Sequence, residues 1–165
     1  MIESRFTFCA ADETDTERLG RGLAEILPPG SVVALDGPLG AGKTRLVQAV
    51  AAACGVDRRD VVSPTFVLVH QYQGQRPIYH LDAYRLRDED EFLQLGVDEY
   101  FVPPNLTFIE WAGRVTRCLP RERIEITIAV LPGEARRFEI VGRGSQATAA
   151  IESLRESRDL SQREG

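Results

Sequence analysis

Lysine is almost absent from this sequence of 165 residues. Of its 20 basic residues, all but Lys43 are arginines. A GTPase of the translation-factor type needs an [Asn/Thr]-Lys-x-Asp motif to recognise guanine. Because the one lysine follows Gly42 instead, that class of protein is excluded.

Cysteine and histidine are also scarce. The three cysteines, Cys9, Cys54 and Cys118, lie far apart and form no Cys-x-x-Cys motif. We therefore expect reduced thiols and no disulfide framework. His70 and His80 lack the spacing of a zinc site.

Long apolar segments and an excess of positive charge are missing as well. No apolar run approaches the roughly 20 residues that span a membrane. The first residues, Met1 to Arg5, lack the basic and apolar regions of a signal peptide, so we expect a cytoplasmic protein with no membrane partner. The net charge of −5 argues against a large nucleic-acid footprint on this chain alone. We expect no DNA partner, and contact with RNA only through another protein.

The single lysine lies inside a glycine-rich segment, 37–44, that reads Gly-Pro-Leu-Gly-Ala-Gly-Lys-Thr. This is the pattern G-x4-G-K-[ST] of a Walker A phosphate-binding loop. An apolar β-branched run at 31–35 precedes it and a helical pattern at 44–54 follows, so the loop should open a helix whose N-terminal N–H groups bind phosphate. We assign the whole loop to nucleotide binding: Gly37, Pro38, Leu39, Gly40, Ala41, Gly42, Lys43 and Thr44. Lys43 is also assigned to catalysis, because a compact ammonium on a thin stem reaches the β- and γ-phosphates where a guanidinium does not fit.

A P-loop protein that binds ATP also needs Mg²⁺, which prefers hard oxygen ligands. Thr44 supplies one hydroxyl by the logic of the motif. Glu110 ends the apolar run 106–109, and Asp82 follows the run 78–81, so both carboxylates are candidate metal ligands and candidate catalytic groups that order water. Both residues also have a purely structural alternative. Glu110 could be a solvated carboxylate at a strand end, and Asp82 could form an Asx turn. The sequence does not divide the roles between them.

The segment 63–66, Ser-Pro-Thr-Phe, follows the P-loop helix, where switch segments lie in related architectures. Thr65 is therefore a candidate contact for the γ-phosphate or its metal. A strand entry in which Pro64 fixes φ explains the same residues equally well.

Alternating strand and helix patterns predict an α/β fold. We expect a three-layer P-loop sandwich, with a mainly parallel central sheet and antiparallel hairpin additions. Apolar segments at 61–62, 66–70 and 78–81 predict strands, and the runs 124–128 and 138–141 predict a second hairpin. A helix should begin at a capping box formed by Thr14 and Glu17. The length suits one domain, placed at 1–144, followed by a C-terminal helix or frayed tail at 145–165.

Four segments in this order resemble the TsaE family: 37–44, 63–66, His-Leu-Asp-Ala-Tyr-Arg at 80–85 and Ile-Glu-Trp at 109–111. The resemblance covers about residues 16 to 141. It implies a P-loop ATPase that works with TsaD and TsaB, which transfer threonylcarbamoyl to an adenosine of tRNA. It also implies that Thr44 and Glu110 bind Mg²⁺, that Asp82 supports activity, and that Thr16 and Arg137 join the nucleotide site. Pro38 and Ala112 depart from the family pattern, but neither position needs a side chain for phosphate binding.

Two other functions remain open. A small P-loop kinase would carry an arginine-bearing lid, for which Arg114, Arg117, Arg121 and Arg123 are the candidates. A nucleotide-gated binding module would bind ATP and hydrolyse it negligibly alone. The family resemblance implies low intrinsic turnover that partners stimulate.

Overall fold

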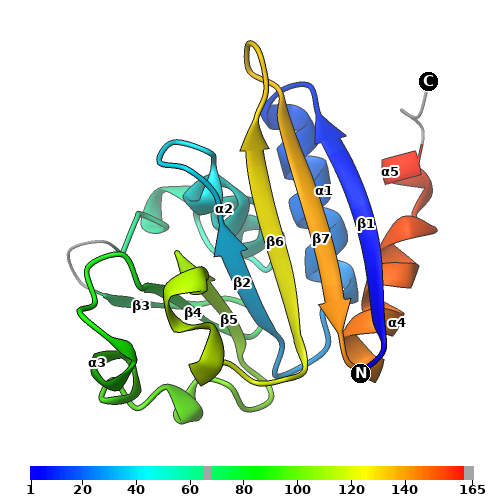
Figure 1. The fold of residues 1–165 in the computed structure, drawn as a ribbon. Helices are drawn as coiled ribbons and strands as arrows, with labels where there is room; N and C mark the ends of the chain where they lie inside the picture. The colour runs from blue at the N-terminus through cyan, green and yellow to red at the C-terminus, as the bar shows by residue number, and fades with distance from the viewer. Residues whose placement is uncertain (65–67, 162–165) are drawn as a thin grey trace.

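A seven-stranded sheet runs through the whole molecule in the computed structural model, which describes residues 1–64 and 68–161 (Figure 1). Its strand order is β1-β7-β6-β2-β5-β4-β3. The strands are β1 (Glu3–Ala10), β2 (Val32–Asp36), β3 (Val69–Gln73), β4 (Pro77–Asp82), β5 (Leu106–Glu110), β6 (Arg123–Val130) and β7 (Arg136–Arg143).

The four central strands β6, β2, β5 and β4 are mutually parallel, and the outer strands β7, β1 and β3 are antiparallel to their neighbours. Strands β2 and β5 are near-continuous apolar runs, as expected for strands covered on both faces. The predicted α/β class, with a parallel centre and antiparallel hairpins, is confirmed.

Helices α1 (Glu13–Ile26), α2 (Lys43–Ala53) and α4 (Ser145–Arg155) share a core on one face of the sheet. Helices α1 and α2 approach each other closely at Gly20, where an added Cβ would lie 2.4 Å from the Cβ of Ala49. Leu23 of α1, Val50 of α2 and Ile151 of α4 are fully buried in this core. The close packing fixes the start of α2, and therefore the P-loop, against α1.

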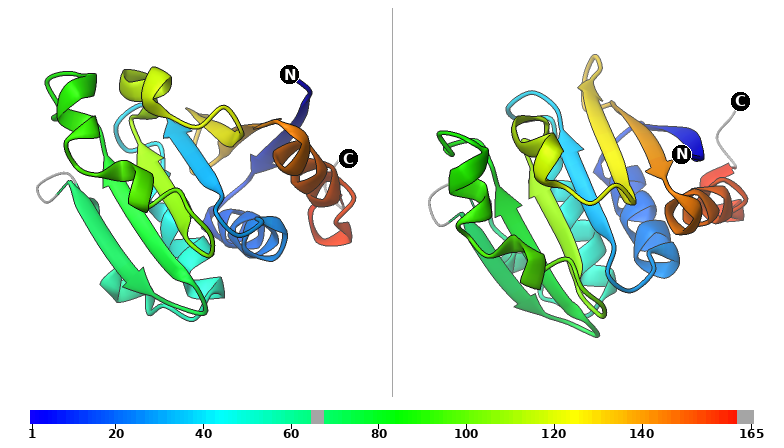
Figure 2. Two further views of the ribbon diagram at one scale, coloured as in Figure 1. Left: turned by 90° about the horizontal axis from the view of Figure 1, so that it is seen from below. Right: turned by 60° about the horizontal axis from the view of Figure 1, so that its bottom comes forward.

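The opposite face of the sheet is covered only in part. The segment from 83 to 119 holds α3 (Glu89–Leu93) and the short 3-10 helices η2 (Val97–Glu99) and η3 (Ala112–Cys118), and it buries Phe92 and Val115 against β2, β4 and β5. Figure 2 shows this segment across the sheet from α1 and α2. On the same face of β6, β7 and β1, within the described residues, no helix lies over the sheet (Figure 1), and Arg5, Thr127, Arg137 and Glu139 are exposed there.

Two local expectations need correction. Helix α1 begins at Glu13 and not at the predicted capping box, because Asp12 is the N-cap and its Oδ1 accepts a hydrogen bond from the Asp15 N–H. Asp15 also accepts from the N–H of Ala11, the residue before the N-cap, so the helix is capped two residues earlier than expected. The expected strand at 61–62 is absent from the described residues: 61–64 belongs to no strand, and β3 starts only at Val69.

The remaining helices are short: η1 (Arg58–Asp60) follows α2, and α5 (Arg158–Ser161) follows α4. Leu154 and Leu160 are buried in the same core as α1, so the segment after 144 packs on the domain. Over the described ranges, no helix has both the length and the apolar character needed to cross a bilayer.

Candidate nucleotide-binding site

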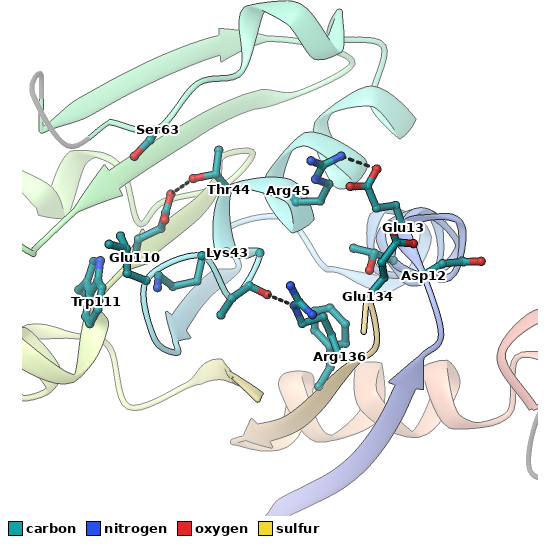
Figure 3. A pocket seen from close by; sticks show the side chains of 16 residues that line it. Asp12, Glu13, Lys43, Thr44, Arg45, Ser63, Glu110, Trp111, Glu134 and Arg136 are labelled. Atoms are coloured by element: carbon teal, nitrogen blue, oxygen red, sulfur yellow. Dashed lines mark hydrogen bonds and ion pairs between the residues drawn. The ribbon is translucent and has the colours of Figure 1, made fainter. Parts of the chain in front are cut away.

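A cavity of about 560 Å³ opens at the carboxyl ends of the central strands, above the loop that joins β2 to α2. This is the edge at which open α/β sheets bind ligands. Its inner wall is the P-loop, and its outer wall is the start of α1 together with the β6–β7 hairpin (Figure 3).

The loop conformation depends on glycine at two positions. Gly42 is the N-cap of α2 with φ of 107°, a left-handed value that disfavours residues with a Cβ. Gly37 has φ of 154°, and a Cβ there would lie 2.8 Å from the carbonyl oxygen of Ile128. The loop can therefore turn at the end of β2 into the N-terminus of α2, and a helix N-terminus is a general anion-binding feature. Five loop residues (Leu39, Gly40, Ala41, Gly42, Lys43) and Thr44 line that cavity, whereas Gly37 and Pro38 lie behind it.

Lys43 is buried, and its ammonium is held by the loop to which it belongs. Nζ donates to the carbonyl oxygens of Gly37 and Pro38 at 2.6 and 3.1 Å, and it lies 4.0 Å from the ring centroid of Trp111. Burial lowers the pKa of Lys43 below its ordinary value, against the opposing attraction of Glu110, Asp36 and Asp82.

Glu110 and Thr44 meet directly at the floor of the cavity. The Thr44 hydroxyl donates to Oε2 of Glu110 at 2.8 Å, across the gap between α2 and β5 (Figure 3). Because the hydroxyl gives its hydrogen to the carboxylate, its lone pairs remain available to a cation. The same Oε2 accepts from Nε2 of His80 at 2.5 Å.

Asp82 lies beside Glu110 at the end of the adjacent strand, in the parallel register of β4 and β5. Its side chain is 3% exposed and its Oδ1 accepts from the N–H of Tyr84 at 2.8 Å. This is the Asx turn that the sequence offered as the purely structural alternative to a metal-binding or catalytic role of Asp82. Asp82 is close enough to influence Lys43 electrostatically, but it does not line the cavity within the described residues.

The outer part of the cavity carries charges of both signs. Thr16 lines it from α1 together with Asp12 and Glu13, and Glu13 pairs with Arg45 of α2 at 2.7 Å. Figure 3 shows Glu134 near this pair and Arg136 below it, next to the P-loop.

Arg137, a residue expected at the nucleotide site, does not line the cavity within the described residues. It lies on the open face of the sheet and pairs with Glu139 at 3.6 Å. Its neighbour Arg136 lines the cavity instead and donates from Nε to the carbonyl oxygen of Ala41. Successive residues of a strand point to opposite faces, so one position decides which arginine reaches the site.

Only part of the candidate switch segment 63–66 lies within the described residues. Ser63 lines the cavity, whereas Thr65 lies outside the described residues. The assignment of Thr65 therefore stays a prediction.

These residues fit ATP and Mg²⁺ on chemical grounds. Gly40 has no atom within 4 Å of where its Cβ would stand, so the loop leaves open space at this position of the cavity wall. Thr44 and Glu110 offer hard oxygen atoms. In the described part of the chain, no group of three or more His, Cys, Asp or Glu could hold a metal unaided. Mg²⁺ typically takes one or two carboxylates and completes its shell with phosphates and water, and Thr44 and Glu110 could serve as its protein ligands.

Sequence reasoning missed His80, Tyr72 and Arg136. His80 precedes Asp82 by two residues on one strand, so strand alternation places both side chains on the same face. That two-residue spacing is the sequence feature that could have identified His80 as a neighbour of the site. Tyr72 carries no such signal, because its position depends on the pairing of β3 with β4.

Comparison with known proteins agrees with this geometry. A family model described as "Threonylcarbamoyl adenosine biosynthesis protein TsaE" matches residues 10–138. The tRNA threonylcarbamoyladenosine biosynthesis protein TsaE of Bacillus subtilis is 36% identical over 85% of this chain and 87% of its own length. The protein of the same name from Synechocystis is 42% identical over 70% of this chain and 75% of its own. The crystal structure of Bacillus subtilis YdiB superposes with a TM-score of 0.78 at 28% identity, covering 94% of this chain and 97% of that one. With most of its length matched by the family model and by these relatives, the chain belongs to the TsaE family.

Proposed function

We propose that this protein binds ATP with Mg²⁺ and hydrolyses it in support of tRNA threonylcarbamoyladenosine biosynthesis. The relatives carry the name of that process. The observation that supports hydrolysis is the contact of Thr44 with Glu110 beside the buried Lys43. A hydroxyl, a carboxylate and an ammonium converge there on one cavity.

Each group has a role that follows from its position. Lys43 exchanges the carbonyl oxygens of Gly37 and Pro38 for phosphate oxygens, which are stronger acceptors because they are charged. Thr44 and Glu110 would hold the cation, with Asp82 next to them, and the bound Mg²⁺ would supply positive charge to neutralise the phosphates. Both contacts of Glu110 fall on Oε2, so Oε1 would be the oxygen that faces the cation or a water molecule bound to it. Thr16 and Arg136 bind the outer part of the nucleotide.

The partners we propose are TsaD and TsaB, in the cytoplasm, with tRNA held by those partners. The net charge of −5 disfavours a direct phosphate-backbone contact. The P-loop cavity opens at one edge of the sheet, where a partner could sense the bound nucleotide.

The gated binding module is kept as a second candidate because of one observation. Nζ of Lys43 contacts two loop carbonyls and the ring of Trp111, so phosphate binding must rearrange this cluster. The kinase is not favoured, because in the described residues none of the four candidate lid arginines lines the cavity, and Arg117 and Arg123 pair with Glu89 and Glu125.

A reconstituted modification assay tests the proposal. TsaD and TsaB are supplied with tRNA and threonylcarbamoyl adenylate, and modified adenosine is measured with this protein, with its Lys43→Ala variant, and with neither. We expect repeated product formation only with the wild-type chain and ATP. Equal yields in all three reactions would refute a role in this process.

A further inference from the structure

A buried chain of hydrogen bonds crosses the sheet beneath helix α2 and ends at Glu110. Nε2 of His80 lies 2.5 Å from Oε2 of Glu110, and Nδ1 of His80 lies 3.2 Å from the hydroxyl of Tyr72. That hydroxyl also lies 3.3 Å from the carbonyl oxygen of Val62. The chain thus links β5, β4 and the edge strand β3 to the segment that leads to Ser63.

The geometry assigns the hydrogen atom at the Glu110 end of this chain. A carboxylate only accepts, so Nε2 of His80 carries the hydrogen that Glu110 receives. At the other end, Nδ1 contacts the Tyr72 hydroxyl, whose single hydrogen is shared between Nδ1 and the carbonyl oxygen of Val62. The partner of one ring nitrogen sets the tautomer and orientation of the other.

Because Glu110 is buried, its side chain is held in place mainly by hydrogen-bond donors of the protein. His80 is 0% exposed and Glu110 is 4% exposed, so water does not replace a lost protein donor easily. Thr44 donates to the same Oε2 from α2. Two donors from different elements therefore fix a side chain with three rotatable bonds.

We infer that His80 is a positioning residue that holds Glu110 in place for the cation, and that Tyr72 holds His80. This inference rests on the proposed Mg²⁺-dependent function, and it concerns only the support of the carboxylate. A buried histidine that merely fills space would show no dependence on which ring nitrogen is kept. Groups behind a metal ligand typically change metal affinity or activity by about 10- to 100-fold when removed.

Two substitutions separate the two ring nitrogens. In His80→Gln the side-chain amide lies where Nε2 lay and still donates to Glu110. In His80→Asn the shorter amide stays near Nδ1 and no longer reaches Glu110. Tyr72→Phe keeps the ring and removes only the hydroxyl. His70→Asn is the matched control, because His70 contacts the Tyr72 ring but does not line the cavity within the described residues.

The main readout is the Mg²⁺ concentration that half-saturates the protein–ADP complex. Trp111, the only tryptophan of the chain, follows Glu110 and reports binding through its fluorescence. Metal-free ADP affinity, measured by calorimetry with EDTA, reports the P-loop alone. ATP turnover at saturating Mg²⁺ and nucleotide is measured for the same variants.

We expect His80→Asn to need about tenfold more Mg²⁺ or more, with unchanged metal-free ADP affinity. His80→Gln and His70→Asn should stay within about threefold of wild type, and Tyr72→Phe should shift in the same direction as His80→Asn by a smaller factor. Wild-type Mg²⁺ dependence in both His80→Asn and Tyr72→Phe would overturn the inference, as would equal shifts in His80→Gln and His80→Asn. If His80→Asn does not fold, Tyr72→Phe and His80→Gln decide between these outcomes. A wild-type protein that ignores Mg²⁺ would instead refute the proposed function itself.

Discussion

At the residue scale, Lys43 is set apart from every other cation of the chain by its surroundings. It is 5% exposed, and its Nζ sits between two loop carbonyls and an indole ring. A planar guanidinium is wider than this space and presents its donors in a fixed fork. The chain uses arginine elsewhere, so the steric demand of the loop accounts for the single lysine.

Lys43→Ala should abolish tight ATP binding, and Lys43→Arg should do nearly as much damage. Loss of one charge-assisted phosphate contact costs about 2–3 kcal/mol. Calorimetric titration with ATP measures both variants, and Arg121→Lys at an exposed site is the control for a change of cation type. Near-native affinity in Lys43→Arg would contradict the steric argument.

The two carboxylates should separate binding from turnover. Glu110→Gln and Asp82→Asn preserve side-chain volume, and ATP should still bind because the loop N–H groups and Lys43 remain. Hydrolysis should fall by about 100-fold or more for a carboxylate that orders metal or water. Steady-state rates measure this, and near-native rates in both variants would mean that the cation lies elsewhere.

The positions of candidate site residues were predictable from the sequence where they depend on the local order of residues. The P-loop, Thr44 and Glu110 follow from a contiguous motif and a strand end. His80 and Arg136 depend on strand pairing and on which face a side chain takes. A shift of one residue in β7 exchanges Arg136 and Arg137 between the cavity and the open face, and no local pattern in Ala-Arg-Arg-Phe separates them.

At the element scale, helix α4 has an unusual N-terminus. Its N-cap is Gly144, which has no side chain, and Oε1 of Glu122 takes that role by accepting from the N–H groups of Gln146 and Ala147 at 2.5 and 3.2 Å. A carboxylate at this position also interacts favourably with the helix dipole. The cap therefore comes from the loop before β6, which sequence patterns around α4 cannot reveal.

Glu122→Ala should lower the free energy of unfolding by about 1 kcal/mol, within the range of about 0.5–2 kcal/mol for a lost N-cap. Glu122→Gln should lose less, because the amide oxygen still accepts. Urea denaturation measures the change. Glu152→Ala, an exposed position on the same helix, should stay within about 0.5 kcal/mol of wild type. Equal stability of the Glu122→Ala and Glu152→Ala variants would show that the contact contributes nothing.

At the scale of the whole molecule, the fold was predictable because strand and helix periods alternate around a P-loop. The partly open second face was not, since it depends on how far the segment 83–119 reaches across the sheet. Helix α4 buries Ile151 and Leu154 in the common core. We therefore propose that the domain extends past the predicted boundary at residue 144 to include this helix.

Charge is distributed over the surface as pairs. Arginines contact carboxylates on several elements, at Arg18, Arg45, Arg58, Arg117, Arg123 and Arg143. Binding of a nucleic-acid backbone needs clustered cations that are free to replace counterions. The arginines named above are already paired with carboxylates, and the net charge of −5 disfavours such binding.

The isolated protein should therefore bind tRNA no more tightly than micromolar at physiological salt, in the range typical of non-specific contacts. Filter binding measures this, with the TsaD–TsaB complex as the positive control. Sub-micromolar binding by this chain alone would show that it carries an RNA site of its own.

The rate of ATP hydrolysis with and without TsaD and TsaB tests the central claim most directly. The account predicts a slow Mg²⁺-dependent rate for the chain alone and a higher rate when the complex is present. The Lys43→Ala variant should give neither. A rate that is indifferent to the partner proteins, or hydrolysis that survives in Lys43→Ala, would contradict the account.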